Sequence, residues 1–302
     1  MKIVRAEVLG FCMGVRRAVE LAIAESEQAK IINNDTSKKN VVYTLGPLIH
    51  NTKVLNDLGA IGVKSVNSPD ELPESADCSV IIRAHGINPK IENDLLNKKY
   101  RIVDATCPKV KINQLKTQEL SDNGFHLFFA GEAEHAEIKG LAGYSCSAVF
   151  CKIIGSIKEA NEAANELYKK NKNAKTALLG QTTISEEEYK CISDEIKKFF
   201  PDIFIVQTIC DATRHRQQAL RDLLTCVDAV IVAGSSESAN TRRLFAIARE
   251  SGKPCILAES KEDIPAYFYS FAAVGLCAGA STPDSVIDEI ENHFKKIIPV
   301  LS

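Results

Sequence analysis

The feature that most constrains this fold is the alternation, along the whole chain, of strand-length apolar segments with helical patterns. The apolar segments lie at residues 41–46, 80–86, 101–107, 125–131, 176–183, 204–210, 229–236 and 272–282. Helical stretches such as 156–170 and 241–251, whose apolar residues recur at three- and four-residue steps, lie between them. Strands that alternate with helices favour parallel sheets covered by helices, so the sequence predicts an α/β protein.

Three cysteines recur at nearly equal spacing within this alternation. Cys12, Cys107 and Cys210 are separated by 95 and 103 residues, and each closes a strand-like run and precedes a candidate helix. Each repeat also contains two strands that end in Gly and polar residues. Because ligands of open parallel sheets bind beyond the carboxyl ends of strands, we expect these segments to converge on one cavity.

We therefore predict a trefoil of three small, pseudo-equivalent α/β domains with parallel sheets around a central cluster cavity. The first domain carries Cys12 and ends at the Cys107 boundary, and the third ends in a C-terminal helix. The predicted domains span residues 1–107, 108–209 and 210–302.

Charge and cysteine content narrow the class of protein. The 302 residues include 37 basic and 39 acidic ones, and the formal net charge of −2 provides no global field that attracts nucleic acid or anionic lipid. The N-terminus lacks the apolar core of a secretory signal, and no apolar run approaches about 18 residues, so we expect a cytoplasmic protein with no membrane or nucleic-acid partner. In a reducing compartment, ten cysteines indicate metal ligands, redox groups or buried small side chains.

The three spaced cysteines favour an iron–sulfur cluster over zinc. Structural zinc sites usually contain paired cysteines at short spacing, and the chain contains no Cys-x-x-Cys. With three protein ligands, one iron of a 4Fe–4S cluster stays open to act as a Lewis acid. A buried structural thiol is the alternative for each, and it is favoured for five others: Cys78, Cys191, Cys226, Cys255 and Cys277. Cys146 and Cys151 receive no role.

Polar side chains at predicted strand ends suggest a phosphate site. His50, His85 and His135 follow strands beside Gly, where a side chain can face a cavity, whereas the remaining three histidines are assigned structural or solvated positions: His126, His215 and His293. Hydroxyl and amide donors occupy similar places: Thr182, Thr183, Ser235, Ser236, Ser238, Asn240, Ser281 and Thr282. Helix capping is the alternative role for these residues, but a helix N-terminus also favours phosphate. A nucleotide is disfavoured, because no Walker or Gly-x-Gly-x-x-Gly motif is present.

Glu137 is the one carboxylate placed among these polar strand ends, two residues beyond His135. A carboxyl group that faces a desolvated metal cavity has a raised pKa and can hold a proton. We therefore predict that Glu137 is the general acid of the site.

Several of these segments together resemble the LytB family of 4-hydroxy-3-methylbut-2-enyl diphosphate reductases. They are GFCMGV, GPLIHN, RAHG, DATCP, GEAEHAE, GQTTIS, ICDATRHRQ, GSSESAN with TRRL, and GAST, in order from residue 10 to about residue 284. The resemblance implies the trefoil fold and a 4Fe–4S cluster held by Cys12, Cys107 and Cys210. It further implies that a two-electron reductive dehydroxylation yields isopentenyl and dimethylallyl diphosphate, with electrons from a donor such as ferredoxin or flavodoxin.

The resemblance also implies roles for the polar residues. His135 lines the pocket, Glu137 relays a proton with Thr182, and five residues bind the diphosphate: His50, His85, Ser238, Asn240 and Ser281. His135 and Thr182 are expected to serve both in catalysis and in substrate binding.

The chain departs from the family pattern at three places. The usual His-Pro-Glu is His135-Ala136-Glu137, Ala239 replaces the Ser before the pocket Asn, and the basic pattern after DATCP is altered around Ile112 and Gln114. One lost hydroxyl at Ala239 is expected to weaken diphosphate binding by about 0.5–1.5 kcal/mol. The alternatives are a diverged paralogue that acts on another allylic alcohol, a noncatalytic iron–sulfur binding or sensor protein, and a zinc hydrolase.

Overall fold

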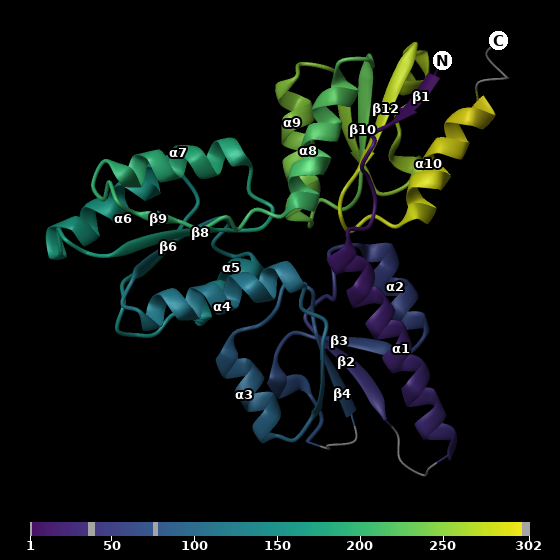
Figure 1. The fold of residues 1–302 in the computed structure, drawn as a ribbon. Coiled ribbons are helices and arrows are strands. Elements are labelled where there is room, and N and C mark those ends of the chain that lie inside the picture. The colour runs from purple at the N-terminus through teal and green to yellow at the C-terminus, as the bar shows by residue number, and fades with distance from the viewer. Residues whose placement is uncertain (1, 36–39, 75–77, 298–302) are drawn as a thin grey trace. The chain divides into compact units, whose positions relative to one another are not determined.

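The computed structural model describes residues 2–35, 40–74 and 78–297, and its strands form three separate four-stranded parallel sheets (Figure 1). The chain divides into two compact units, each of which is described here by itself. Unit 1 contains one sheet and comprises residues 1–16, 49–56 and 210–302. Unit 2 contains two sheets and comprises residues 17–48 and 57–209. The three parallel sheets confirm the predicted α/β class.

In unit 2, the first sheet has the order β3-β2-β4-β5 and the second has the order β7-β6-β8-β9. The strands of the first sheet are β2 (Val41–Leu45), β3 (Val63–Val66), β4 (Cys78–Ile82) and β5 (Arg101–Asp104). Those of the second are β6 (His126–Ala130), β7 (Cys151–Ile154), β8 (Thr176–Gly180) and β9 (Phe204–Ile205). In both sheets the strand that comes first along the chain pairs with the second and the third, and the fourth lies at the edge.

The sheet of unit 1 has the same order, but its fourth strand comes from the other end of the sequence. Its strands are β10 (Ala229–Ala233), β11 (Cys255–Ala258), β12 (Ala273–Ala278) and β1 (Lys2–Arg5). Their order is β11-β10-β12-β1, so β1 takes the edge position that β5 and β9 occupy in the other two sheets. Val4 pairs with Gly275 in this parallel ladder. The same four-strand order therefore occurs three times, and β1 is the edge strand of the third sheet.

Both faces of each sheet are covered, because alternate residues of a strand point to opposite sides. In unit 1, Ile231 and Leu276 pack with residues of α10 (Asp284–Ile297) in one core, whereas Val230 and Val232 pack with α8 (Asp211–Leu224) and α9 (Ala239–Glu250) in another. Figure 1 shows α10 on one side of this sheet and α8 and α9 on the other. The central strands β10 and β12 are buried apart from Ala273 at the start of β12, which explains their continuous apolar sequences.

Unit 2 is layered in the same way. Phe128 packs toward α6 (Ile157–Lys170) and α7 (Glu186–Lys197), and Phe129 packs toward α5 (Ala136–Gly143) on the opposite face, where α4 (Pro108–Asp122) also lies. In the other sheet, Val80 faces α3 (Pro89–Asn97), and Ser79 on the opposite face donates a hydrogen bond to Glu25 of α1 (Met13–Asp35) at 2.6 Å. Helix α2 (Thr52–Ala60) and α1 each contain residues of both units.

Helix α6 illustrates how the local sequence determines the buried face and the ends of a helix. Its buried residues Ala160, Ala163, Ala164 and Leu167 follow the three- and four-residue spacing of one helical face. Ser156 caps the N-terminus by accepting a hydrogen bond from the Glu159 N–H at 3.2 Å, and two lysines in the last turn favour the C-terminal dipole. The helix predicted for residues 156–170 is confirmed within one residue. Three short 3-10 turns complete the described elements: Pro69–Glu71, Lys261–Asp263 and Ala266–Ser270.

The predicted domain boundaries at residues 107 and 209 stay a prediction. Strands β2 to β5 and β6 to β9 fall within residues 1–107 and 108–209 respectively, whereas β1 pairs with the sheet formed by residues 229–278. Within the described ranges, no helix has the combination of length and apolar character needed to cross a membrane.

Candidate functional site

The carboxyl group of Glu137 is held inside unit 2 by the end of a neighbouring strand. Glu137 lies in the first turn of α5, after β6, and Thr182 lies two residues beyond β8, which pairs with β6. The Thr182 N–H donates to Oε1 of Glu137 at 2.7 Å, and the Thr182 hydroxyl donates to Oε2 at 2.8 Å. The structure thus brings together the two residues expected to relay a proton.

Burial changes the acidity of this carboxyl group. Glu137 is 1% exposed, and desolvation raises its pKa to about 7, although the two hydrogen bonds from Thr182 act in the opposite direction. A protonated carboxyl group and a carboxylate are therefore both accessible near neutral pH, as a general acid requires. Burial therefore shifts the pKa of Glu137 in the direction that the sequence predicted, and the role of Glu137 as the general acid stays a prediction.

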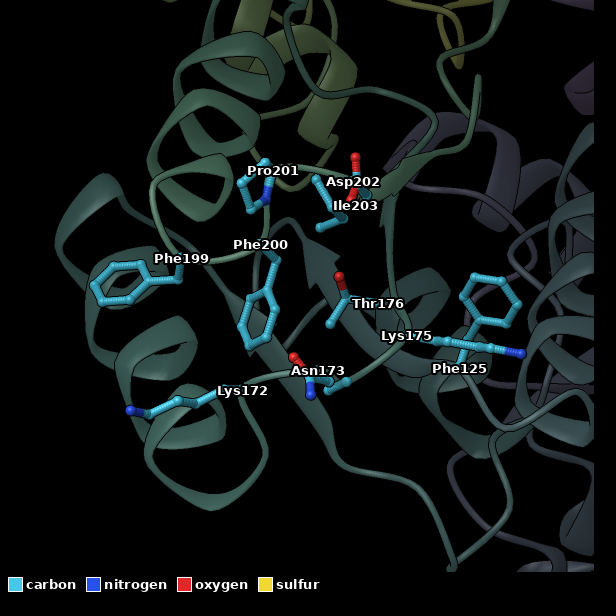
Figure 2. A pocket seen from close by; sticks show the side chains of 11 residues that line it. Phe125, Lys172, Asn173, Lys175, Thr176, Phe199, Phe200, Pro201, Asp202 and Ile203 are labelled. Carbon is cyan, nitrogen blue, oxygen red and sulfur yellow. The ribbon is translucent and has the colours of Figure 1, made fainter.

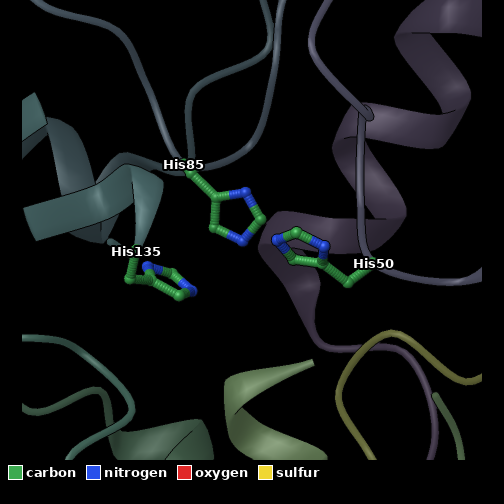
Figure 3. A group of neighbouring side chains, drawn as sticks. All are labelled: His50, His85 and His135. Carbon is green, nitrogen blue, oxygen red and sulfur yellow. The ribbon is translucent and has the colours of Figure 1, made fainter. Parts of the chain in front are cut away.

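His135 is the N-cap residue of α5, two residues before Glu137. Its Nδ1 accepts a hydrogen bond from the Glu137 N–H at 3.2 Å, so a neutral imidazole carries its hydrogen on Nε2. The ring of His85, which follows β4, meets the His135 ring edge to face with 5.1 Å between their centroids (Figure 3). Two of the histidines predicted to line a pocket therefore lie in contact within unit 2.

Unit 1 gathers a second set of predicted residues at the carboxyl ends of β10 and β12. These strands are neighbours, with Ala233 opposite Ala278, so the segments that follow them begin side by side. Ser238 caps α9 by accepting a hydrogen bond from the Thr241 N–H at 3.4 Å. The hydroxyl of Ser281 donates to the backbone carbonyl of His50 at 3.0 Å, so Ser281 must release this carbonyl before it can donate to a ligand.

Asn240 is the best indication that this part of unit 1 binds a polar ligand. The side chain is 4% exposed, and neither its Nδ2 nor its Oδ1 has a hydrogen-bond partner among the described residues. Burial of an unpaired amide is costly unless a water or ligand satisfies it. Asn240 lies in the first turn of α9, where the helix dipole favours an anion.

The three spaced cysteines occupy equivalent positions, although the prediction that strands run up to them is wrong. Strand β5 ends at Asp104, β9 at Ile205 and β1 at Arg5, so a loop separates each fourth strand from its cysteine. The helices that follow begin at Met13, Pro108 and Asp211, so each cysteine lies between a loop and the first residue of a helix. Cys107 and Cys210 are N-cap residues, and the Val15 N–H points to Cys12 Sγ at 3.5 Å. A helix N-terminus favours a negatively charged thiolate.

The remaining cysteines match the buried positions predicted for them only in part. Cys78 and Cys277 are buried in strands, and burial raises the pKa of Cys277 to about 12, which keeps it a neutral thiol. The buried position predicted for Cys191 in α7 and for Cys226 after α8 is wrong, because both are exposed, and Cys255 is only partly buried. His126 begins β6, and its Nδ1 accepts from the Phe150 N–H at 2.8 Å.

The sequence argument missed two buried polar residues near these positions. Gln114 on α4 is 1% exposed, lies beside Gly86 and Gly140, and has no partner for either amide atom in the part of the chain that the structure describes. Arg216 on α8 is 4% exposed. Arg216 lies in a motif that carries the family resemblance, and Gln114 lies where the chain departs from the family pattern, but a Gln or Arg on a helix has no local pattern that predicts burial. Ile112, the other altered position after DATCP, is 60% exposed.

A separate cavity lies beside the amino-terminal ends of the strands in the second sheet of unit 2. It has a volume of about 590 Å³ and is lined by the segments that precede β8 and β9, including Lys172, Phe200 and Asp202 (Figure 2). These residues lie at the amino-terminal ends of the strands, whereas Thr182 follows the carboxyl end of β8. The cavity is therefore distinct from the Glu137 site.

Comparisons with known proteins agree over nearly the whole chain. Residues 3–295 match the family described as LytB protein. A Treponema denticola protein named 4-hydroxy-3-methylbut-2-enyl diphosphate reductase is 40% identical over 297 residues, which cover 97% of this chain and 99% of that protein.

Two solved structures are also similar. The E-1-hydroxy-2-methyl-but-2-enyl-4-diphosphate reductase from Plasmodium falciparum has a TM-score of 0.86 and 25% identity, and the match covers 97% of this chain and 87% of that one. A structure of (E)-4-hydroxy-3-methyl-but-2-enyl diphosphate reductase has a TM-score of 0.68 and 34% identity, with 98% and 99% of the chains covered. The family match, the near-complete coverage and the shared fold lead to one conclusion: this chain belongs to the LytB protein family.

Proposed function

We propose that this chain is a 4-hydroxy-3-methylbut-2-enyl diphosphate reductase, an oxidoreductase of the non-mevalonate isoprenoid pathway. The reaction replaces the allylic hydroxyl group of the substrate by hydrogen, and two electrons and two protons convert the alcohol into the product and one water. Isopentenyl diphosphate and dimethylallyl diphosphate are the two products. The observation that carries the proposal is the buried Glu137–Thr182 pair, in a chain whose close relatives bear the name of this enzyme.

The three equivalent cysteines fit an iron–sulfur cofactor, in keeping with a family of iron–sulfur enzymes. Cys12, Cys107 and Cys210 are partly exposed thiols that each precede a helix N-terminus, and thiolates are the ligands of such clusters. A 4Fe–4S cluster with three cysteine ligands would supply electrons and one iron that acts as a Lewis acid. An external donor such as ferredoxin or flavodoxin, and a cytoplasmic location, belong to the same proposal.

Glu137 and Thr182 are assigned the proton that leaves with the substrate hydroxyl group. Oε2 of Glu137 lies 2.8 Å from the Thr182 oxygen, so the carboxylic acid can pass a proton to Thr182 while the Thr182 hydroxyl passes its own hydrogen onward. Hydroxide is a poor leaving group, and its protonation makes water the leaving group instead. His135 lines the same site and donates through Nε2.

The diphosphate group is assigned to five neutral donors: His50, His85, Ser238, Asn240 and Ser281. The unpaired amide of Asn240 and the start of α9 support this assignment, because both favour phosphate oxygens.

The deciding experiment is an anaerobic assay with the allylic diphosphate and a chemical reductant, combined with single cysteine substitutions. Cys12→Ser, Cys107→Ser and Cys210→Ser should each lose the visible absorption of the cluster and all turnover, because each removes one ligand. Cys226→Ser and Cys277→Ser are matched controls that should retain both. Turnover by a variant that lacks one of the three ligands, or wild-type protein that binds zinc instead of iron, would refute the proposal.

A further inference from the structure

A buried arginine joins the two cysteine-bearing segments of unit 1. Arg216 lies on α8, six residues after Cys210, and is 4% exposed. Its Nη2 donates to the carbonyl oxygen of Gly10 at 2.6 Å, and its Nη1 donates to the carbonyl oxygen of Ala212 at 2.9 Å. Gly10 lies two residues before Cys12, and Ala212 lies two residues after Cys210. One guanidinium group therefore holds both segments in place.

Among the residues that the structure describes, no carboxylate forms an ion pair with Arg216, and the Arg216 Nε has no hydrogen-bond partner. Burial lowers the pKa of Arg216, whereas the charged forms of Cys12 and Cys210 raise it. An uncompensated buried charge is strongly unfavourable, so a fold that retains one is expected to place negative charge beside it.

The other unit provides an informative contrast at the third cysteine. Arg17 of α1 donates to the carbonyl oxygens of Thr106 and Asp104 at 3.2 and 3.1 Å, just before Cys107. Arg17 is only partly buried. An arginine that holds the backbone of a cysteine segment is thus found in both units, but the deeply buried charge is found at Arg216.

We propose that Arg216 is a positioning residue and a fixed counter-charge for the cofactor: it joins the Cys12 and Cys210 segments and stabilises the reduced, more negative state of the cluster. This inference rests on the proposed function, because it requires an iron–sulfur cluster at these cysteines. Reduction adds one electron to a group that carries thiolate ligands, and a nearby positive charge in a medium of low dielectric constant favours that added charge. Loss of the charge should therefore make the cluster harder to reduce.

Three variants separate the charge of Arg216 from its hydrogen bonds. Arg216→Met removes both, and Arg216→Lys keeps a positive charge but lacks the planar group that reaches two carbonyl oxygens. Arg221→Gln, in the last turn of the same helix, is the matched control. Each protein is purified anaerobically, and far-UV circular dichroism, iron and sulfide content, and the midpoint potential of the cluster are measured by redox titration.

We expect Arg216→Met to shift the ratio of reduced to oxidised cluster at least tenfold toward the oxidised form, which is about 59 mV for one electron. Arg216→Lys should contain less iron than wild type but keep this ratio within about threefold, because its charge remains. Arg221→Gln should match wild type in both measurements.

Two outcomes would overturn the inference. One is a cluster in Arg216→Met whose potential matches wild type, because a purely structural role changes cluster content and leaves the potential unchanged. The other is complete loss of the cluster in both folded Arg216 variants, because a counter-charge role requires the lysine to restore binding. If wild-type protein contains no iron–sulfur cluster, the proposed function itself fails, and that result is distinct from either outcome.

Discussion

At the scale of single residues, the burial of Glu137 couples its protonation to the stability of the fold. Because the folded-state pKa of about 7 lies above the ordinary value of 4.5, protonated Glu137 stabilises the fold fully below about pH 4.5. This contribution is lost as the pH rises through about 7. The difference corresponds to about 3 kcal/mol.

Glu137→Gln should therefore reduce the pH dependence of the free energy of unfolding between pH 4.5 and 7 by about 3 kcal/mol. Its turnover should fall by about 10²–10⁴, because Gln cannot deliver the proton. Urea unfolding at several pH values and the anaerobic assay measure the two effects. Glu134→Gln is the control, because the Glu134 side chain is 90% exposed and should affect neither. Turnover within a few-fold of wild type would mean that another group is the acid.

Substitution of Asn240 should weaken substrate binding without lowering thermal stability. Asn240→Ala should weaken substrate binding by about 1–3 kcal/mol, because a phosphate oxygen loses its donor. In the absence of ligand, the thermal midpoint should not fall, because the amide atoms that are lost have no partner within the described part of the chain. Calorimetry on cluster-loaded protein and thermal unfolding measure these effects, with Ser251→Ala at the far end of α9 as the control. Unchanged affinity would place the diphosphate elsewhere.

At the scale of elements, the carboxyl end of β8 must remain closely packed to hold Thr182. A Cβ atom at Gly180 would lie 2.8 Å from the ring of Tyr189, whose hydroxyl lies within 2.9 Å of the Leu178 and Val206 carbonyl oxygens. Gly180→Ala should destabilise the protein by about 1–3 kcal/mol. It should also lower turnover by about 10–100-fold, because Thr182 shifts.

Gly155→Ala provides the matched control, because the nearest atoms to its added Cβ lie at 3.6 Å. It should be neutral or stabilise the protein by up to about 1 kcal/mol. Denaturant unfolding and steady-state kinetics compare the two. Equal effects of both substitutions would show that close packing at Gly180 is unimportant.

At the scale of the whole molecule, the threefold repeat predicts that the chain tolerates circular permutation. Arg5 of β1 forms ion pairs of 2.7 Å with Asp288 and Glu291 of α10. Strand β1 therefore lies next to α10 and takes the place of the strand that would come after this helix, as β5 comes after α3 in the sequence. A permutant that joins residue 302 to residue 1 by a short Gly/Ser linker, and opens between the exposed Lys172 and Asn173, should fold and bind the cofactor. Circular dichroism and iron content test this.

A second permutant, opened between Leu178 and Leu179 within the buried strand β8, is the control and should not fold. Failure of the first permutant with a linker of any length would contradict the view that β1 is the displaced fourth strand of a repeat.

The sequence by itself determined the α/β class and the threefold repeat of cysteines and strand-end polar residues, and it predicted Glu137 as the candidate acid. These features depend on patterns within a few residues or on regular spacing, which a single chain displays directly. Only the tertiary structure decided that β1 closes the sheet of residues 229–278, because strand pairing across some 270 residues leaves no local signal. The tertiary structure also decided the burial of Arg216 and its hydrogen bond to the carbonyl oxygen of Gly10. The exposure of an arginine on a helix depends on which distant segment packs against that helix.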